Sequence, residues 1–324
     1  MRAVVGRPFV DATGGSLQAT PWVQAGGSES ATTAISWAGE TAAEAAAPTS
    51  NATAWARTVL GEDWRRRALG EHASVASFSA FSISLMSNGA PAGLVADALE
   101  AGLDEVRHAR MSFHIAARLT GKNEAPGPLP ESKHQFRQDM RLLALAVAAE
   151  GCVDETLSAF SAAFEVKHIS DVLEKRAQGS LYSSIDHEDD PELLTFIKND
   201  LITIAMDESN HAALAWRTLN WICSVDQTAC EAVYANVFEE TNLKLRFEQH
   251  AGRTHSDTSL VVHSMREEWI KFFEAHQLMN SDLEDTSSLE FVCTKNGEED
   301  KGHASFALLA SMTENILRQV LCTV

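Results

Sequence analysis

Two stretches of the sequence share one pattern: Asp104-Glu105-Val106-Arg107-His108 and Asp207-Glu208-Ser209-Asn210-His211. Both read D-E-x-x-H, and both lie in the middle of apolar segments with helical spacing. Residues three positions apart lie on one face of a helix, so the Glu and the His of each motif can reach one metal ion. An Asp four residues before a His can accept the imidazole N–H, as metal-bound histidines usually require. The motifs therefore predict four metal ligands, Glu105, His108, Glu208 and His211, surrounded by Asp104, Asp207, Arg107 and Asn210.

Two other E-x-x-H pairs occur, Glu131 with His134 and Glu165 with His168, and both are interpreted as ordinary residues. The first pair follows a proline in a polar connector, where its side chains are expected to be solvated. The second pair lies at the end of its helix, about 22 Å beyond Glu150 at the rise of an α-helix, which is too far to share a site. The two D-E-x-x-H motifs therefore remain the centre of the prediction.

A dinuclear iron site in a four-helix bundle takes one more glutamate from each of the two remaining helices. Glu71 is the candidate in the first helix, because it is the only acidic residue between Trp64 and Met86. It precedes the turn at Asn88 by about the same helical length, roughly 26 Å, as the roughly 23 Å by which Glu105 follows that turn. In an antiparallel hairpin the two carboxylates therefore lie at the same level.

The third helix offers several acidic candidates. Glu150 follows the apolar run LLALAVAA, where an unpaired carboxylate is costly and favours a nearby cation. Glu174 has the spacing to the second D-E-x-x-H motif that Glu71 has to the first, 34 positions, but its neighbours are polar. Choosing Glu150 implies an insertion at about 167–190. Glu150 is therefore the predicted ligand, and the backup candidates are Asp154, Glu155 and Glu174.

The distribution of apolar residues predicts an all-α protein, since helical spacing recurs between turn signals and strand alternation is nearly absent. The connector at 120–135 can extend to about 53 Å, and the helix before it is about 42 Å long. A long crossover between the second and third helices of a four-helix bundle is therefore possible. The expected organisation is an extended or poorly ordered arm at 1–60, the bundle at 61–224 with its insertion, and a C-terminal helical extension at 225–324.

As a set, Glu71, Glu150 and the two D-E-x-x-H motifs resemble the ligands of the ferritin-like di-iron carboxylate superfamily. The residue sequence DEVRH of the first motif is similar to the motif of the oxygen-activating monooxygenases in this superfamily. The segments EHASVASF at 71–78 and EGCVDET at 150–156 resemble a subgroup of ferritin-like domain proteins without an assigned reaction.

The resemblance covers about 64–222 and implies a ferritin-like bundle whose six ligands hold two Fe ions, with Mn as the alternative in one or both positions. The sequence departs from the pattern in three places. It carries the insertion between the third and fourth helices, it has Asn210 where an arginine would mirror Arg107, and its C-terminal third is unmatched.

The function that the resemblance implies is activation of O₂ by a di-iron oxidoreductase, an oxidase or oxygenase acting on a small organic substrate. An iron-handling ferroxidase or rubrerythrin-like peroxidase is the first alternative, and a metal-free helical interaction scaffold is the second. An apolar pocket opening on the metal pair favours the organic substrate, whereas a polar channel open to solvent favours iron handling. The sequence has no rubredoxin-like Cys₄ module, so an electron donor is expected to be a separate protein.

The composition limits the partners. With 26 Lys and Arg against 45 Asp and Glu, the net charge of −19 disfavours binding to nucleic acid and to anionic lipid. An apolar run of the length that spans a membrane is absent from the sequence, and a homo-oligomer stays open. Scattered cysteines without a C-x-x-C pair predict reduced thiols and a cytoplasmic location. These cysteines are Cys152, Cys223, Cys230, Cys293 and Cys322.

Overall fold

The computed structural model describes residues 17–22, 37, 51–130, 137–178, 191–238 and 242, and within them the protein is mostly helical, as predicted. The α-helices are α2 (Asn51–Ser87), α3 (Ala92–Thr120), α4 (Met140–Ala146), α5 (Thr156–Ala177), α6 (Pro191–Val225) and α7 (Gln227–Val233). Two π-helical segments are η2 (Val147–Glu155) and η3 (Tyr234–Phe238), and two short strands are β1 (Pro21–Trp22) and β2 (Ala125–Pro126).

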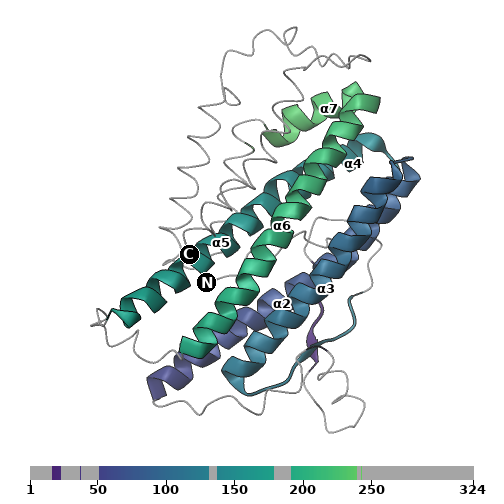
Figure 1. Ribbon diagram of the computed structural model, residues 1–324. Helices are drawn as coiled ribbons and strands as arrows, with labels where there is room; N and C mark the ends of the chain where they lie inside the picture. The colour runs from purple at the N-terminus through teal and green to yellow at the C-terminus, as the bar shows by residue number, and fades with distance from the viewer. Residues whose placement is uncertain are drawn as a thin grey trace.

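The long helices α2, α3, α5 and α6 lie side by side (Figure 1), and α6 packs against α3, η2 and α5. Helices α2 and α3 form a hairpin that turns at Asn88 and Gly89. Gly89 has a φ of +71°, a left-handed conformation that glycine adopts at little cost, and the following Ala90 N–H donates to the Leu85 carbonyl at 3.0 Å. The turn therefore fixes the register in which α3 runs back along α2.

The connector after α3 returns the chain to the opposite end of that helix. Helix α3 ends at Thr120 and is capped by Gly121, which has the left-handed conformation usual at this position, with a φ of +71°. Strand β2 in the connector pairs antiparallel with β1. The backbone N–H of Arg137 then donates to Ser84 Oγ at 3.3 Å, and its carbonyl accepts from Asn88 Nδ2 at 2.7 Å, beside the start of α3. The connector thus passes along the length of α3, about 43 Å for its 29 residues.

The helix boundaries differ from the expected ones at two places. Helix α2 begins at Asn51, inside the stretch 1–60 that was expected to be an arm, and α5 continues to Ala177, inside the insertion expected at about 167–190. Polar residues on the outer face of α5, such as Lys167, are compatible with a solvated helix, which is why polarity alone did not mark its end. Residues 179–190, and nearly all of the C-terminal extension beyond Phe238, lie outside the described residues.

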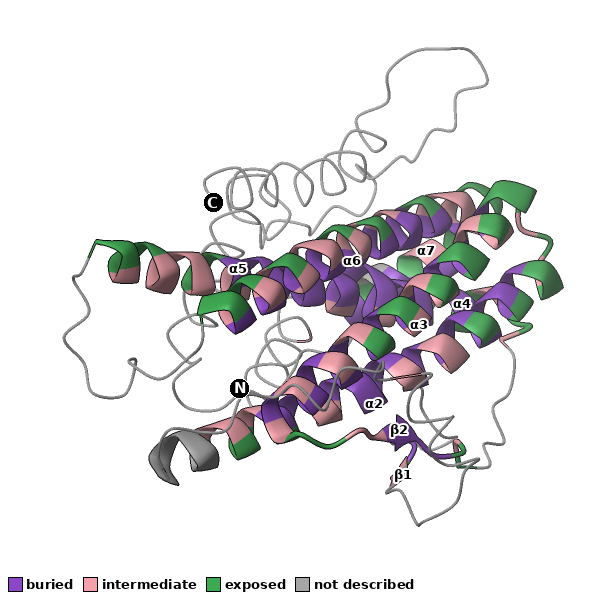
Figure 2. Ribbon diagram, turned by 60° about the horizontal axis from the view of Figure 1, so that its bottom comes forward, coloured by how far each residue is buried: buried purple, intermediate pink, exposed green. Residues whose placement is uncertain are grey.

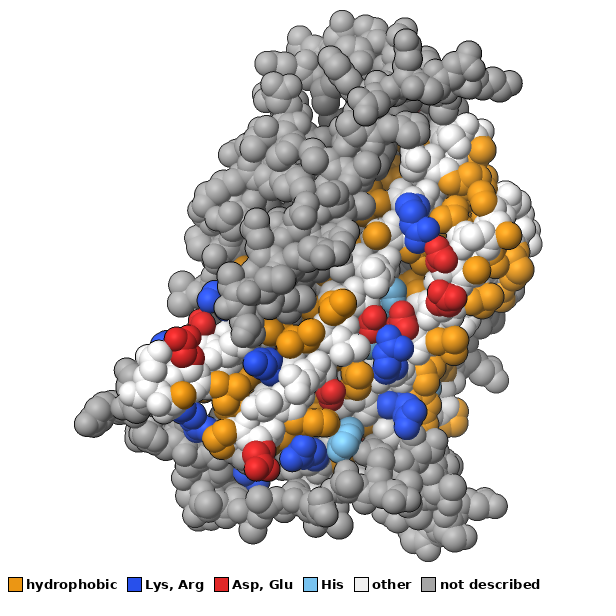
Figure 3. Space-filling view, in the orientation of Figure 1, with side chains coloured by type: hydrophobic (Ala, Val, Ile, Leu, Met, Phe, Trp, Pro, Cys, Tyr) orange, Lys and Arg blue, Asp and Glu red, His pale blue; other side chains and the backbone are white. Residues whose placement is uncertain are grey.

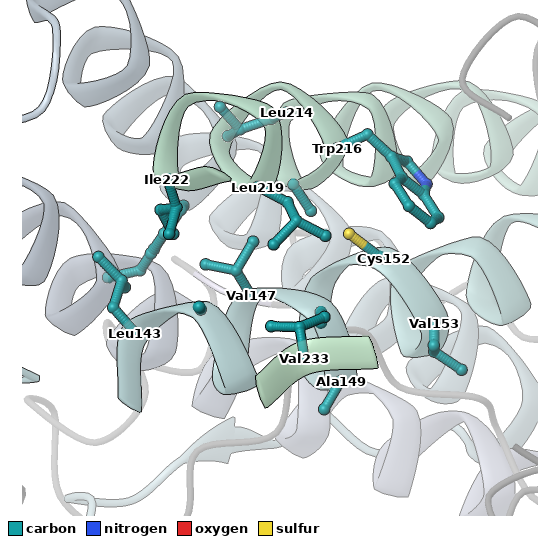
Figure 4. Close-up of a cluster of buried hydrophobic side chains, with 14 of the residues drawn as sticks. Leu143, Val147, Ala149, Cys152, Val153, Leu214, Trp216, Leu219, Ile222 and Val233 are labelled. Atoms are coloured by element: carbon teal, nitrogen blue, oxygen red, sulfur yellow. The ribbon is translucent and has the colours of Figure 1, made fainter. Parts of the chain in front are cut away.

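Of the three apolar clusters among the described residues, the two larger ones lie between the helices, one on either side of a polar layer. Buried residues line the inward faces of the helices, and exposed residues line the outward faces (Figure 2). On α2, Trp64 belongs to one cluster and Phe78 to the other, and Glu71 lies between them; on α6 the clusters include Ile204 and Leu214. Figure 4 shows part of the second cluster, where side chains of η2 and α6 face one another. No helix among the described residues is long and apolar enough to cross a membrane.

The expectation that all the cysteines are reduced thiols is wrong for one pair. Cys223 and Cys230 form a disulfide that joins the end of α6 to α7, with Cα atoms 5.0 Å apart. The turn between the two helices brings together residues seven positions apart, a spacing that C-x-x-C reasoning does not detect. Cys152 is buried and takes no part in this disulfide. Because of the disulfide, the cysteines no longer support a cytoplasmic location; Cys293 and Cys322 lie outside the described residues.

The close approach of α2 to α3 gives a stability prediction. A Cβ at Gly61 would lie 2.3 Å from Thr120 Cγ2 and 3.4 Å from Leu119 Cβ. We expect Gly61→Ala to destabilise the protein by about 1–3 kcal/mol, because the helices must move apart or Thr120 must give up its hydrogen bond to Ala116. Gly93→Ala is the matched control, since its Cβ meets nothing within 4 Å, and it should leave stability unchanged or raise it by up to about 1 kcal/mol. Urea unfolding followed by circular dichroism measures both; equal stability of the two variants would contradict the prediction.

Candidate metal centre

The polar layer between the apolar clusters contains two groups of side chains that could hold a metal ion. Within each group, the ligand atoms lie within 4.8 Å of one another. Glu105 and Glu208 belong to both groups, so the two groups adjoin. Each group adds one glutamate and one histidine of its own. The first group is Glu71, Glu105, His108 and Glu208, and the second is Glu105, Glu155, Glu208 and His211.

Every helix that borders the layer contributes. Glu71 comes from α2 and Glu155 from the last residue of η2, whereas α3 and α6 each contribute the Glu and the His of a D-E-x-x-H motif. The spacing of three residues places the Glu and the His of each motif on one helix face, as the sequence predicts. All six side chains are at most 3% exposed. The structure thus brings together five of the six predicted ligands, and Glu155 takes the place of Glu150.

The buried polar atoms of this layer fit a cation. Both carboxylate oxygens of Glu105 and one each of Glu71 and Glu208 make no hydrogen bond within the described part of the protein. The same holds for Nδ1 of His108 and of His211. Buried carboxylates without donors are costly, and so is their mutual repulsion, unless positive charge is placed among them. This donor set of carboxylate oxygens and imidazole nitrogens could therefore hold a metal ion.

Each histidine is oriented by the aspartate of the other motif. His108 Nε2 lies 3.0 Å from Asp207 Oδ2, and His211 Nε2 lies 3.4 Å from Asp104 Oδ2. An ionised aspartate only accepts, so Nε2 is the donor and Nδ1 faces the glutamates. The sequence interpretation paired each Asp with the His four residues later on its own helix, and this pairing is wrong. Residues four positions apart on one helix lie one above the other, whereas the facing helix brings its aspartate to the outer side of the ring.

Arg107 holds the two aspartates at the surface of the protein. Its guanidinium Nη2 lies 2.8 Å from Asp104 Oδ1 and 2.7 Å from Asp207 Oδ2, and the side chain is half-exposed. Asn210 is exposed on α6 and takes no part in these hydrogen bonds. On the face drawn in Figure 3, acidic and basic side chains lie next to one another. Arg107 is therefore the residue that links α3 to α6 above the histidines.

Glu155 lies in the cluster because of the π-helix. The sequence prediction chose Glu150, but the structure places this residue outside the cluster, where its Oε1 binds Arg137 Nη2 at 2.8 Å. A π-helix has more residues per turn than the α-helix assumed from the sequence, so η2 changes which acidic residue faces inward. Neither of the two remaining acidic candidates takes part: Asp154 is half-buried and outside both groups, and Glu174 is exposed near the end of α5.

A small polar pocket reaches the cluster from the side of α5. It has space for at most about one water molecule. Its outer part contains an ion pair that the sequence did not predict, between Arg67 Nη2 and Glu165 Oε1 at 2.7 Å. Glu165 was set aside with His168, which is exposed; the other excluded histidine, His134, lies outside the described residues. The pocket is lined by Arg67, Glu71, Ser158, Ser161, Ala162, Glu165, Ile204 and Glu208.

The pKa values within the cluster show how strongly its groups interact. Burial raises the pKa of Glu71 well above its usual value, and the neighbouring Glu105 and Glu208 raise it further. Burial also opposes ionisation of Glu105, but the adjacent imidazoles of His108 and His211 outweigh it and lower its pKa to about 2. The imidazoles respond in the opposite direction. Burial disfavours their charge, yet the facing aspartates and glutamates raise the pKa of His211 to about 9 and that of His108 well above its usual value.

Comparison of the chain with protein-family models, with curated proteins and with solved structures gave no match.

The raised pKa values predict that the metal-free protein loses stability as the pH rises. Glu71 favours the folded state in its protonated form, so its contribution decreases above its ordinary pKa of 4.5. The contribution of the His211 imidazolium is complete below its ordinary pKa of 6.5 and is lost as the pH rises through about 9. Urea unfolding in the presence of a chelator, from about pH 5 to about pH 9.5, should show this fall. His211→Gln should lessen the fall above about pH 6.5, to which His108 and Glu71 also contribute; a stability that is constant or rises with pH would contradict the prediction.

Proposed function

We propose that the chain is a non-haem di-iron carboxylate protein that reacts with O₂, built on a ferritin-like four-helix bundle of α2, α3, η2 with α5, and α6. The observation that carries this proposal is the pair of adjoining ligand groups. Glu105 and Glu208 are common to both groups, and each group has one glutamate and one histidine of its own. A single-metal site does not require this duplication, whereas two ions that share carboxylates do.

The donor set suits iron. Hard carboxylate oxygens combined with borderline imidazoles favour Fe or Mn over the softer metals that thiolates select. Four buried glutamates carry a charge that two divalent cations would balance. Two bound Fe(II) ions would supply the electrons that reduce O₂, and Mn is the alternative in one or both positions. A separate protein is the expected source of further electrons.

The residues of the chain would hold and orient such a pair. Glu71 and His108 belong to one position and Glu155 and His211 to the other. The aspartates fix the imidazoles in the tautomer whose Nδ1 is available, and Arg107 fixes the aspartates. The apolar clusters on both sides limit the access of water to the layer. The layer is thus organised for metal before any metal is bound.

The pocket bears on the kind of reaction. It is lined mainly by charged and hydroxyl side chains, and it has no room for an organic molecule. We infer that iron handling, as a ferroxidase or a rubrerythrin-like peroxidase, fits this approach better than oxidation of a small organic substrate, which the sequence favoured. The metal-free scaffold is the least compatible alternative, because four buried carboxylates around two imidazoles destabilise a bundle that has no other use for them.

Metal content tests the centre. The protein, purified without oxygen and supplied with Fe(II), is expected to bind about two ions per chain. Glu155→Gln and Glu105→Gln should each reduce the content below about one ion, since each removes an anionic ligand. Glu150→Gln is the matched control on the same helix and should keep the wild-type content, because Glu150 pairs with Arg137. Elemental analysis after gel filtration measures the number of ions bound per chain. A wild type without metal, or an equal loss in Glu150→Gln and Glu155→Gln, would sink the proposal.

Iron turnover tests the reaction class. When excess Fe(II) is added in air, an iron-handling centre should oxidise many ions per chain, because each product ion leaves the site. Glu155→Gln should fall to the rate of Fe(II) in buffer, and Glu150→Gln should not. Oxygen consumption and the ultraviolet absorbance of Fe(III) give the rate. Oxidation that stops after about two ions per chain would contradict a ferroxidase and leave a peroxidase or an oxidase of an organic substrate as the better interpretation.

A further inference from the structure

The small polar pocket lies on one side of the metal centre, between α2, α5 and α6. At its inner end are Glu71 and Glu208, each with a buried carboxylate oxygen that makes no hydrogen bond. Ser158, on the α5 wall, is also buried, and its hydroxyl has no hydrogen-bond partner among the described residues. Three polar groups without donors or acceptors thus face one small space. Such a lining offers oxygen atoms that a cation could satisfy.

The outer part of the pocket is closed by the ion pair between Arg67 and Glu165, which are 98 positions apart in the sequence. The side chains of Arg67 and Glu165 are 8% and 19% exposed, so the carboxylate is the partner nearer to solvent. The guanidinium also lies 4.2 Å from the ring centroid of Trp64. The arginine is therefore held between a carboxylate and an aromatic face, and it is positioned one helical turn before Glu71 on α2.

The pocket in this conformation is too narrow for a hydrated metal ion, since it holds at most about one water molecule. A cation that enters here must first separate Arg67 from Glu165. The arginine side chain is long and has several rotatable bonds, so its guanidinium can move without a change in the backbone. Once it has moved, Glu165 and the Ser158 and Ser161 hydroxyls present oxygen donors between solvent and the cluster.

We propose that this pocket is the route by which the divalent cation reaches the metal centre, and that the Arg67–Glu165 ion pair is its gate. The proposal rests on the metal centre proposed above and adds its means of loading. Glu165 attracts the incoming ion, and Arg67 opposes it until the ion pair opens. No other side chain that lines the pocket carries a positive charge.

The two partners of the pair should have opposite effects, which a merely structural ion pair would not show. Arg67→Gln removes the opposing positive charge and should accelerate uptake by metal-free protein about tenfold. Glu165→Gln leaves that charge uncompensated and should slow uptake about tenfold. Fe(II) alone is the probe, under anaerobic conditions, with the free metal removed by a chelator after increasing times. The final iron content of both variants should equal that of the wild type, because neither residue is a ligand.

The controls separate the gate from the centre. Arg67→Met keeps the aliphatic stem beside Trp64 and replaces Arg67→Gln if that variant does not fold. Asp97→Asn and Arg217→Gln break an ion pair of the same length, 2.7 Å, that also joins two helices but lies away from the pocket, and they should not change the rate. Equal rates in all variants, or slowing by both partner substitutions, would overturn the gate while the centre stands. A wild type that takes up no iron would overturn the metal centre itself.

Discussion

The structure depends on the burial of four glutamates and two histidines between two apolar clusters. Burial and then repulsion by Glu105 and Glu208 raise the pKa of Glu71, and the imidazoles between the carboxylates offset only part of the charge. The surrounding helices keep this layer closed because α2 and α3 form a tight hairpin and α6 packs on both α3 and α5. The layer is thus a strained arrangement that the apolar clusters support, and two divalent cations would relieve the strain.

The histidines link this buried layer to the surface. Each imidazole ring is held in a fixed orientation by its hydrogen bond to an aspartate on the facing helix, and Arg107 connects the two aspartates. Because each motif needs the other to orient its imidazole, neither helix can supply a complete site alone. The arrangement also explains why one arginine is sufficient. Arg107 reaches both aspartates, so Asn210 at the corresponding position of α6 has no such role.

Much of the cluster was predictable from the sequence because helical periodicity is local. The D-E-x-x-H spacing identified two pairs of inward residues, and equal distances from the turn identified Glu71. The prediction went wrong where the chain leaves regular geometry. The π-helix η2 brings Glu155 inward and directs Glu150 to Arg137, and nothing in the composition of that segment marks the change. The first residues of α2 and the last residues of α5 were also not predicted to be helical, since polar and small residues are compatible both with a solvated helix and with a loop.

The sequence by itself therefore determined that the protein is helical and that α3 and α6 each carry a glutamate and a histidine on one face that could bind a metal ion, because both follow from the spacing of neighbours along one helix. Only the tertiary structure decided which residues of different helices meet. The exchange of aspartates between motifs and the pairing of Arg67 with Glu165 depend on which helices are adjacent and at what height. Spacing along the chain does not contain that information, because contacts between helices are set by the packing of their apolar faces and by the turns that connect them.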